Sequence, residues 1–440
     1  MSYALHRNLL KTPPQAVKGD GAHLIDSTGK RYLDASGGAA VSCLGHSHPA
    51  IIEAVQRQVE QLPYAHTSFF TTDVLEELAE TLVKNAPGMG KVLLLSGGSE
   101  TIEAALKLSR QYFLESGEPD RHLFIARRQS YHGNTLGALA VGGNEWRRES
   151  FRPLLVAGHH IAPCFEYRER AVIETQKEYG SRVALELEAK INELGPKNVA
   201  GFVAETVVGA TAGAVTAVPG YFGHIREICD RYGIHLRLDE VMCGTGRTGS
   251  MMAYEQEHIT PDMVTMAKGL AAGYQPVGAL LCTSKISDAI RKGSGYFQHG
   301  HTFMGHATAV AAALAAQKVI KDEGLLGNVV ERGKAIKAEL KKNLANHPHV
   351  GDVRGRGMFI GVEFVSDRET KTPFDPASKF HNKVQLEAMD RGLLCYGMGG
   401  TVDGRVGDHI LLAPPYNLDD QEQKELVETF VAAVAAGLPD

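Results

Sequence analysis

The chain has 440 residues, of which 43% are hydrophobic and 22% charged, and a formal net charge of -5. A chain of this length exceeds what one hydrophobic core usually serves, so we expect two domains. The acidic balance, without any run of lysine and arginine, argues against nucleic acid or a membrane surface as a partner, and no apolar run is long enough to span a bilayer. Six cysteines without paired spacing are typical of reduced thiols, so we expect a cytoplasmic protein.

The first predicted elements are a hairpin and two helices. Residues 22–34 read as two extended arms around a turn that contains glycine. A glycine-rich loop at 36–46 then leads to a helical pattern from Ile51 to Val59, and a second helix is predicted from Thr72 to Lys84. Glycine loops of this kind usually serve only to turn the chain.

A strand, a loop and a helix follow at residues 92–113. The loop Ser96-Gly97-Gly98-Ser99 places bare amides and a hydroxyl at the start of the predicted helix. The dipole and the unpaired N–H groups of a helix N-terminus favour a phosphate there. A plain helix cap by Ser99 explains the same residues equally well.

Strands and helices then alternate, which predicts an α/β domain with a mainly parallel sheet. Strands are expected at 123–126, 199–205 and 234–241, with a helix at 220–232. Ligands of such sheets bind beyond the carboxyl ends of the strands, so we expect Glu205, Asp239 and Glu240 to line one crevice. Arg237 interrupts an otherwise apolar strand; pairing with a nearby carboxylate would explain it, and an engineered or lineage-specific substitution is the alternative.

The glycines at 244–249 match the G-x-G-x-x-G pattern of nicotinamide-binding proteins. That fingerprint joins a strand directly to a crossover helix, and a second strand ends in an acidic residue about twenty positions later. Here Met251-Met252-Ala253-Tyr254 leads to Pro261-Asp262 without such a strand end. An NAD-dependent dehydrogenase is therefore a remote alternative.

Lys268 lies between small and apolar residues, in Thr265-Met266-Ala267-Lys268-Gly269-Leu270. Most lysines beside glycine are simply exposed. If this one is buried, the loss of hydration disfavours its ammonium form, and the free amine can attack a carbonyl to form a Schiff base.

The pattern changes after about residue 320. A long helix is expected at 325–344, strands near 358–362 and 393–396, and a last helix from Asp419. We therefore predict a large α/β domain at 60–320 and a small α+β domain formed by both termini, 1–59 and 321–440.

Several motifs, in order, resemble the class III aminotransferases, which are pyridoxal-phosphate enzymes of fold type I. They are Ser96-Gly97-Gly98-Ser99-Glu100, Tyr131-His132-Gly133, Leu238-Asp239-Glu240-Val241, Gly246-Arg247-Thr248-Gly249, Ala267-Lys268-Gly269 and His301-Thr302-Phe303-Met304-Gly305-His306. The resemblance extends over about residues 20–420. It implies a large domain with a mainly parallel seven-stranded sheet, a smaller α+β domain, and pyridoxal 5'-phosphate as the cofactor.

The resemblance also implies roles for individual residues. Lys268 would form the Schiff base with the cofactor and then carry a proton, and Asp239 would pair with the pyridinium nitrogen and keep it protonated. Glu205 would support the phenolic side of the ring. The implied cofactor-binding set is Gly98 and Ser99 at the phosphate, Tyr131 and Val241 on either face of the ring, His132, Asp239, Lys268, and Thr302 from the second subunit of a homodimer.

Departures from the family pattern concern the substrate. Relatives that use glutamate tend to carry a glutamate where Ala210 stands, and Val241-Met242-Cys243-Gly244 is closer to the ω-amino acid:pyruvate branch. Arg405 is the candidate for the mobile, carboxylate-binding arginine of that branch; an ordinary surface arginine is the alternative. Tyr131 and Ala40 are the other candidates for substrate contact, because relatives place a tryptophan near Ala40 and a smaller side chain enlarges the pocket.

The expected reaction is the transfer of an amino group from a primary amine or ω-amino acid to a 2-oxo acid, most simply pyruvate, by a ping-pong Schiff-base mechanism. An aminomutase, a dialkylglycine decarboxylase or an amino-acid racemase on the same fold would use the same lysine and stays open. A binding protein without activity is disfavoured, because the lysine, the aspartate and the phosphate loop are all present.

Overall fold

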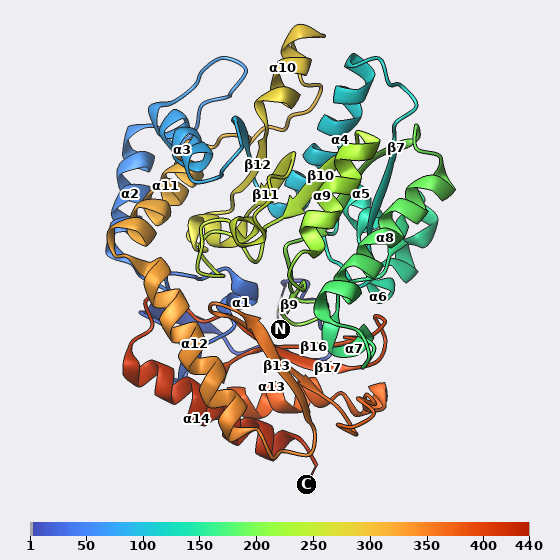
Figure 1. The fold of residues 1–440 in the computed structure, drawn as a ribbon. Helices are drawn as coiled ribbons and strands as arrows, with labels where there is room; N and C mark the ends of the chain where they lie inside the picture. Colours follow the sequence, from blue (N-terminus) through green and yellow to red (C-terminus); the bar gives the residue numbers. More distant parts are fainter. Residues whose placement is uncertain (1–2, 440) are drawn as a thin grey trace.

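A seven-stranded sheet forms the centre of the molecule in the computed structural model, which describes residues 3–439 (Figure 1). Its spatial order is β4 (Lys91–Leu95), β12 (Gly278–Cys282), β11 (Met263–Met266), β10 (His235–Asp239), β7 (Val199–Glu205), β5 (Leu123–Arg127) and β6 (His159–Ile161). Only β12 runs antiparallel to its two neighbours. The mainly parallel sheet expected from the sequence is confirmed.

Helices cover both faces of this sheet, as a parallel sheet requires. All seven residues of β7 are buried. Helix α4 (Gly98–Glu115) packs on β11 and β12, and α9 (Tyr221–Tyr232) packs between β10 and α8 (Gln176–Leu194). The other helices of this part are α2 (Pro49–Gln61), α3 (Asp73–Lys84), α5 (Leu136–Val141), α10 (Ser284–Lys292) and α11 (Ala307–Asp322).

Short polar patterns fix where several helices begin. Thr175 and Glu178 form a capping box at the start of α8, and Asp419 and Glu422 form another at the start of α14 (Asp420–Gly437). In each box the two residues satisfy one another's unpaired backbone N–H groups. The predicted helix that follows Asp419 is therefore confirmed, with that residue as its cap.

Two four-stranded sheets lie outside the large sheet, and one of them combines both ends of the chain (Figure 1). In one, β1 (Ala16–Asp20), β2 (His23–Asp26) and β3 (Arg31–Asp34) are joined by β15 (Leu393–Leu394), and the predicted hairpin at 22–34 is confirmed. The other consists of β13 (Val350–Arg356), β14 (Phe359–Phe364), β17 (Asp408–Leu412) and β16 (Tyr396–Gly399), with α12 (Leu325–Asn343), α13 (Phe380–Asp390) and α14 nearby. The pairing of β3 with β15 agrees with a small domain built from both termini, although the proposed boundaries stay a prediction.

The remaining elements are short. They are α1 (Gly37–Ala40), α6 (Glu145–Arg148), η1 (Glu149–Leu154), α7 (Glu166–Glu169), β8 (Val207–Val208), β9 (Val215–Thr216), η2 (Ala253–Glu257), η3 (Lys268–Ala271) and η4 (Pro376–Ser378). Within residues 3–439, none of the helices combines the length and the apolarity that a membrane crossing requires.

Arg237 in β10 has no carboxylate partner among the described residues, so pairing with a carboxylate, one of the two explanations that the sequence left open, is wrong. Its Nε donates to Oγ of Ser109 at 3.1 Å, and its guanidinium stacks 4.2 Å from the ring centre of Phe124. Both terminal nitrogens are buried without a hydrogen-bond partner. Burial lowers the pKa of this guanidinium to about 9. The nearby carboxylate of Asp262 pairs with Arg226 instead, at 2.7 Å.

Candidate active site

The carboxyl ends of five strands of the large sheet meet at one cavity of about 140 Å³. Every cofactor-binding residue expected within one subunit lines it. The lining is Gly98, Ser99, Tyr131, His132, Gly133, Glu205, Val207, Asp239, Val241, Met242 and Lys268. The prediction that a ligand site lies beyond the strand ends therefore agrees with the structure.

Lys268 lies two residues beyond the end of β11 and begins η3. Its φ of 51° lies in the left-handed region, which is costly for a residue other than glycine and recurs at functional sites. The side chain is partly buried, and its Nζ donates to the carbonyl oxygen of Ala39 at 3.2 Å. Burial lowers the pKa of this amine, while the carboxylates of Asp239 and Glu205 oppose the change. The lysine thus has the desolvated surroundings that Schiff-base chemistry needs.

Asp239 ends β10 and is held from two sides. Its Oδ1 accepts from the N–H of Val241 at 3.0 Å, and its Oδ2 lies 2.8 Å from Nδ1 of His132. The carboxylate and the imidazole are both almost fully buried. Nε2 of His132 is buried with no hydrogen-bond partner in the part of the chain described. A carboxylate fixed in this way is suited to receive a charged N–H group.

Glu205 ends β7, beside Asp239 on the adjacent strand. Its Oε2 accepts from the N–H of Tyr131 at 3.3 Å, and its Oε1 accepts from the N–H of Gly209 at 3.1 Å. Burial raises the pKa of this carboxyl to about 7, with a further contribution from Asp239 and opposition from His132. Near neutral pH the group therefore exists both as a hydrogen-bond donor and as an acceptor.

The loop before α4 approaches the rest of the cavity closely. A side chain at Gly98 would place its Cβ 3.1 Å from Cγ1 of Val241, so the absence of a side chain lets the loop reach the cavity. The residue that caps α4 is Gly97, and Ser99 makes no cap hydrogen bond. Its hydroxyl instead bonds Asn134, through Oδ1 at 3.0 Å and the N–H at 3.1 Å. The alternative that Ser99 is a plain cap is wrong.

Glu240 was expected to line the same crevice, and that expectation is wrong. The strand ends at Asp239, and Glu240 turns to the other side of the backbone, as successive extended residues do. Its carboxylate is buried and accepts from the N–H groups of Ala253 at 2.6 Å and Tyr254 at 2.9 Å. Glu240 therefore holds the chain beyond β10 and takes no part in the cavity.

Three predicted residues lie outside the cavity lining. Thr302 is exposed, and its carbonyl accepts from the hydroxyl of Tyr64 at 2.7 Å. Ala40 is buried in an apolar cluster that also contains Val207. Arg405 lies on an exposed loop and pairs with Glu149 at 3.2 Å, and the two side chains are 62% and 56% exposed.

Arg147 lies beside the cavity, against Tyr131, and the sequence did not reveal it. Its guanidinium lies 4.6 Å from the ring centre of Tyr131, and its charge lowers the pKa of Lys268 further. It makes no ion pair with any described residue, and its Nε is buried without a partner. The nearby sequence offers only Gly142-Gly143, which indicates a tight turn: a Cβ at Gly143 would lie 2.1 Å from the carbonyl oxygen of Arg127.

This geometry agrees with the comparison with known proteins. A family model described as aminotransferase class-III matches residues 5–434. The chain belongs to the class III aminotransferases. An aminotransferase of Gibberella zeae is 42% identical over 440 residues, which cover 99% of this chain and 86% of the relative. The resemblance expected from the motifs is confirmed, and the dehydrogenase alternative no longer applies.

Two solved structures show how far the similarity of this class III aminotransferase extends. A thermostable (S)-enantioselective omega-transaminase from Thermomicrobium roseum has a TM-score of 0.93 and 33% identity, and the match covers 99% of this chain and 97% of that one. An amine transaminase from an uncultivated Pseudomonas species, in its PLP-bound form, has a TM-score of 0.91 and 34% identity, with 98% and 97% covered. The fold type I architecture is confirmed, and the cofactor of the family is pyridoxal phosphate.

The G-x-G-x-x-G loop has a structural role in this enzyme. It leads into η2 and not into a crossover helix. Arg247 within it is buried, donates to the carbonyl oxygens of Met358 and Pro414, and stacks 4.6 Å from the ring centre of Tyr416. The loop thus attaches the chain after β10 to the C-terminal part of the molecule.

Proposed function

We propose that this class III aminotransferase uses pyridoxal phosphate to move an amino group from a primary amine or ω-amino acid to a 2-oxo acid, with pyruvate as the acceptor. The observation that carries the proposal is that the desolvated amine of Lys268 and the hydrogen-bonded carboxylate of Asp239 line the same cavity. When bound, the cofactor supplies an electron sink for negative charge that develops at the substrate Cα.

The residues present fit this cofactor. The first turn of α4, with Gly98 and the hydroxyl of Ser99, offers unpaired amides to a phosphate. Asp239, positioned by His132, would hold a ring N–H⁺, and Glu205 with a pKa of about 7 suits a phenolic oxygen. In this proposal Lys268 attaches the cofactor covalently and transfers a proton, which is supported by its position in the cavity and by the burial that lowers the pKa of its amine.

Arg147 supports the part of the proposal that concerns ω-amino acids, which carry a carboxylate. It is an uncompensated cation against Tyr131, and Tyr131 lines both the active-site cavity and an adjoining one that contains Arg147. A guanidinium without a partner is a ready site for a carboxylate. Arg405 remains the alternative: its exposed ion pair with Glu149 is worth at most about 1 kcal/mol, so it can release and turn inward.

The proposal includes a homodimer in which Thr302 reaches the phosphate of the partner subunit. Support comes from exposed aromatic side chains near Thr302. Phe303 is 59% exposed and meets Tyr64 edge to face, and Phe69 and Phe70 are 77% and 68% exposed. Large apolar side chains gathered on a surface are typical of a protein–protein interface. The proposed compartment is the cytoplasm, which suits six unpaired, buried cysteines.

The test is the visible spectrum of the purified, cofactor-loaded protein while amines are added without an acceptor. We expect the band of the lysine-bound cofactor to disappear with some donors and to return with pyruvate. Recovery with another 2-oxo acid only would reject pyruvate, and product formation without any acceptor would favour the mutase or racemase alternatives.

Lys268→Ala should retain the cofactor without a covalent bond and lose nearly all turnover, by several orders of magnitude, because attachment and proton transfer both depend on this amine. Borohydride trapping followed by mass spectrometry should label the Lys268 peptide only in the wild type. Lys424→Ala, which removes an exposed lysine, serves as the matched control. Turnover of Lys268→Ala close to that of this control would refute the assignment.

A further inference from the structure

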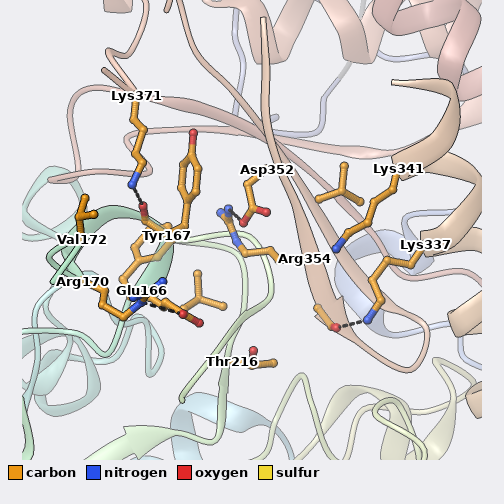
Figure 2. Close-up of a pocket in the computed structure, with 14 residues that line it drawn as sticks. Glu166, Tyr167, Arg170, Val172, Thr216, Lys337, Lys341, Asp352, Arg354 and Lys371 are labelled. Carbon is orange, nitrogen blue, oxygen red and sulfur yellow. Dashed lines mark hydrogen bonds and ion pairs between the residues drawn. The ribbon is translucent and has the colours of Figure 1, made fainter. Parts of the chain in front are cut away.

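A second cavity, of about 570 Å³, lies between segments that are far apart in the sequence. Its walls come from α7 and the residues beside it, from β9, from α12, from β13, and from the loop that contains Lys371. Figure 2 shows Lys337 and Lys341 extending from α12 toward this space, with Arg170 on the opposite side. None of these residues belongs to the active-site cavity.

The charges around this cavity are unbalanced. Its two carboxylates are already paired: Glu166 with Arg170 at 2.9 Å, and Asp352 with Arg354 at 3.1 Å. The lysines that line it are Lys337, Lys341 and Lys371. None of the three forms an ion pair with a described carboxylate, so three positive charges face the cavity without compensation in a chain whose net charge is -5.

The contacts of the lysines leave donors free for a ligand. Lys337 donates to the carbonyl oxygen of Gly355 at 2.7 Å, and Lys371 donates to that of Tyr167 at 2.6 Å (Figure 2). Each ammonium group has three N–H donors, so two remain on each of these lysines. No hydrogen bond is found for Nζ of Lys341 within residues 3–439, and Lys341 is exposed at the mouth of the cavity.

The spacing of Lys337 and Lys341 is unfavourable without a ligand. They are four residues apart on α12, where like charges repel and destabilise a helix. Burial, and next the charge of Lys341, lower the pKa of Lys337. An anion between the two ammonium groups would remove this repulsion and would be bound by charge-assisted hydrogen bonds.

We propose that this cavity, lined by Lys337, Lys341 and Lys371, binds a small phosphate-bearing anion. A phosphate group offers several acceptor oxygens to the two lysines that extend from α12, and Lys371 adds positive charge from the opposite wall (Figure 2). The cavity is separated from the active site by the β8–β9 hairpin: Val207 lines the active-site cavity and pairs with Thr216, which lines this one. A bound anion would therefore contact the same hairpin that follows Glu205.

The test is isothermal titration of the pyridoxal-phosphate-loaded enzyme with inorganic phosphate and with glycerol 3-phosphate, at constant ionic strength maintained with NaCl. Loading with the cofactor keeps the phosphate loop at Ser99 occupied. Tighter binding of glycerol 3-phosphate would identify an organic phosphate as the ligand, and equal binding would identify free phosphate; both results support the site. Absence of binding by both probes would overturn it.

Substitutions of the cavity lysines test where phosphate binds. Lys341→Gln should weaken phosphate about tenfold, because one charge-assisted hydrogen bond contributes roughly that factor, and Lys337→Gln/Lys341→Gln should abolish measurable binding. Lys342→Gln is the matched control: it removes the same charge from the next position of α12, outside the cavity lining. Equal affinity of the wild type, this control and the double variant would place the phosphate elsewhere and reject the proposal.

Discussion

At the scale of single residues, Arg147 and Arg405 offer two ways to bind a substrate carboxylate. Arg147 forms no ion pair within residues 3–439 and stacks on Tyr131, whereas Arg405 is exposed and paired with Glu149. We predict that Arg147→Ala lowers kcat/KM for 4-aminobutyrate by about 10- to 100-fold, the loss expected for one charge-assisted pair, and changes that for butylamine little.

The same assay on Arg405→Ala distinguishes the two arginines, and Arg152→Ala, which removes an exposed arginine paired with Glu145, is the control. Loss of 4-aminobutyrate activity only in Arg405→Ala would show that Arg405 binds the carboxylate. Equal losses for both donors in Arg147→Ala would show that Arg147 only supports Tyr131.

Two buried glutamates give this protein a calculable dependence of stability on pH. Burial raises the pKa values of Glu205 and Glu240 from about 4.5 to about 7. The folded state therefore binds more protons than the unfolded state between these values. The contribution of each carboxyl to stability is fully present below about pH 4.5 and is lost as the pH rises through about 7.

The cofactor-free wild type should lose free energy of unfolding as the pH rises from 5 to 8. We predict that Glu205→Gln and Glu240→Gln each lose less over this range, by on the order of 2 kcal/mol. Denaturant titrations at the two pH values measure this. Only Glu205→Gln should also change the absorption of the bound cofactor, since Glu240 faces away from the cavity. An unchanged pH dependence in both variants would contradict the raised pKa values.

At the scale of elements, β10 contains a buried charged residue that lowers the stability of the fold. Arg237 is buried with two unpartnered nitrogens, and replacing a poorly satisfied buried charge by an apolar side chain is often stabilising. We predict that Arg237→Leu raises the free energy of unfolding by about 1–3 kcal/mol, as measured by denaturant titration. Arg226→Leu, which breaks the pair with Asp262, should lower it. A destabilised Arg237→Leu would mean that the stacking on Phe124 outweighs the missing hydrogen bonds.

Some of the elements that the sequence predicted correctly have a long, clear period. Helices α2, α3 and α12 show one apolar face, and the strand ends correctly brought Glu205 and Asp239 together. Strand β12 was missed because Gly278-Ala279-Leu280-Leu281-Cys282 is a short run buried on both faces and, unlike β4 and β5, contains no β-branched residue. The direction of Glu240 and the position of Arg147 depend on turns whose geometry follows from packing at a distance.

At the scale of the whole molecule, the exposed aromatic side chains around Thr302 predict a dimer. Phe303→Asp should shift the protein toward monomers in sedimentation velocity experiments, because it places a charge in an apolar interface. It should also weaken the retention of pyridoxal phosphate if Thr302 serves the partner's site. Leu386→Asp, at a 50% exposed position on α13, controls for the added charge. A wild-type protein that sediments as a monomer would refute the dimer.

The place of β12 in the large sheet has a consequence for how the enzyme is made. This strand is the last of the seven to leave the ribosome, yet it lies between β4, the first, and β11. Until about 282 residues have been synthesised, the segment that carries Gly98 has no strand to join it to the segment that carries Lys268. Pairings so distant in sequence form slowly. We therefore expect the nascent chain to capture its cofactor only after most of the chain has been translated.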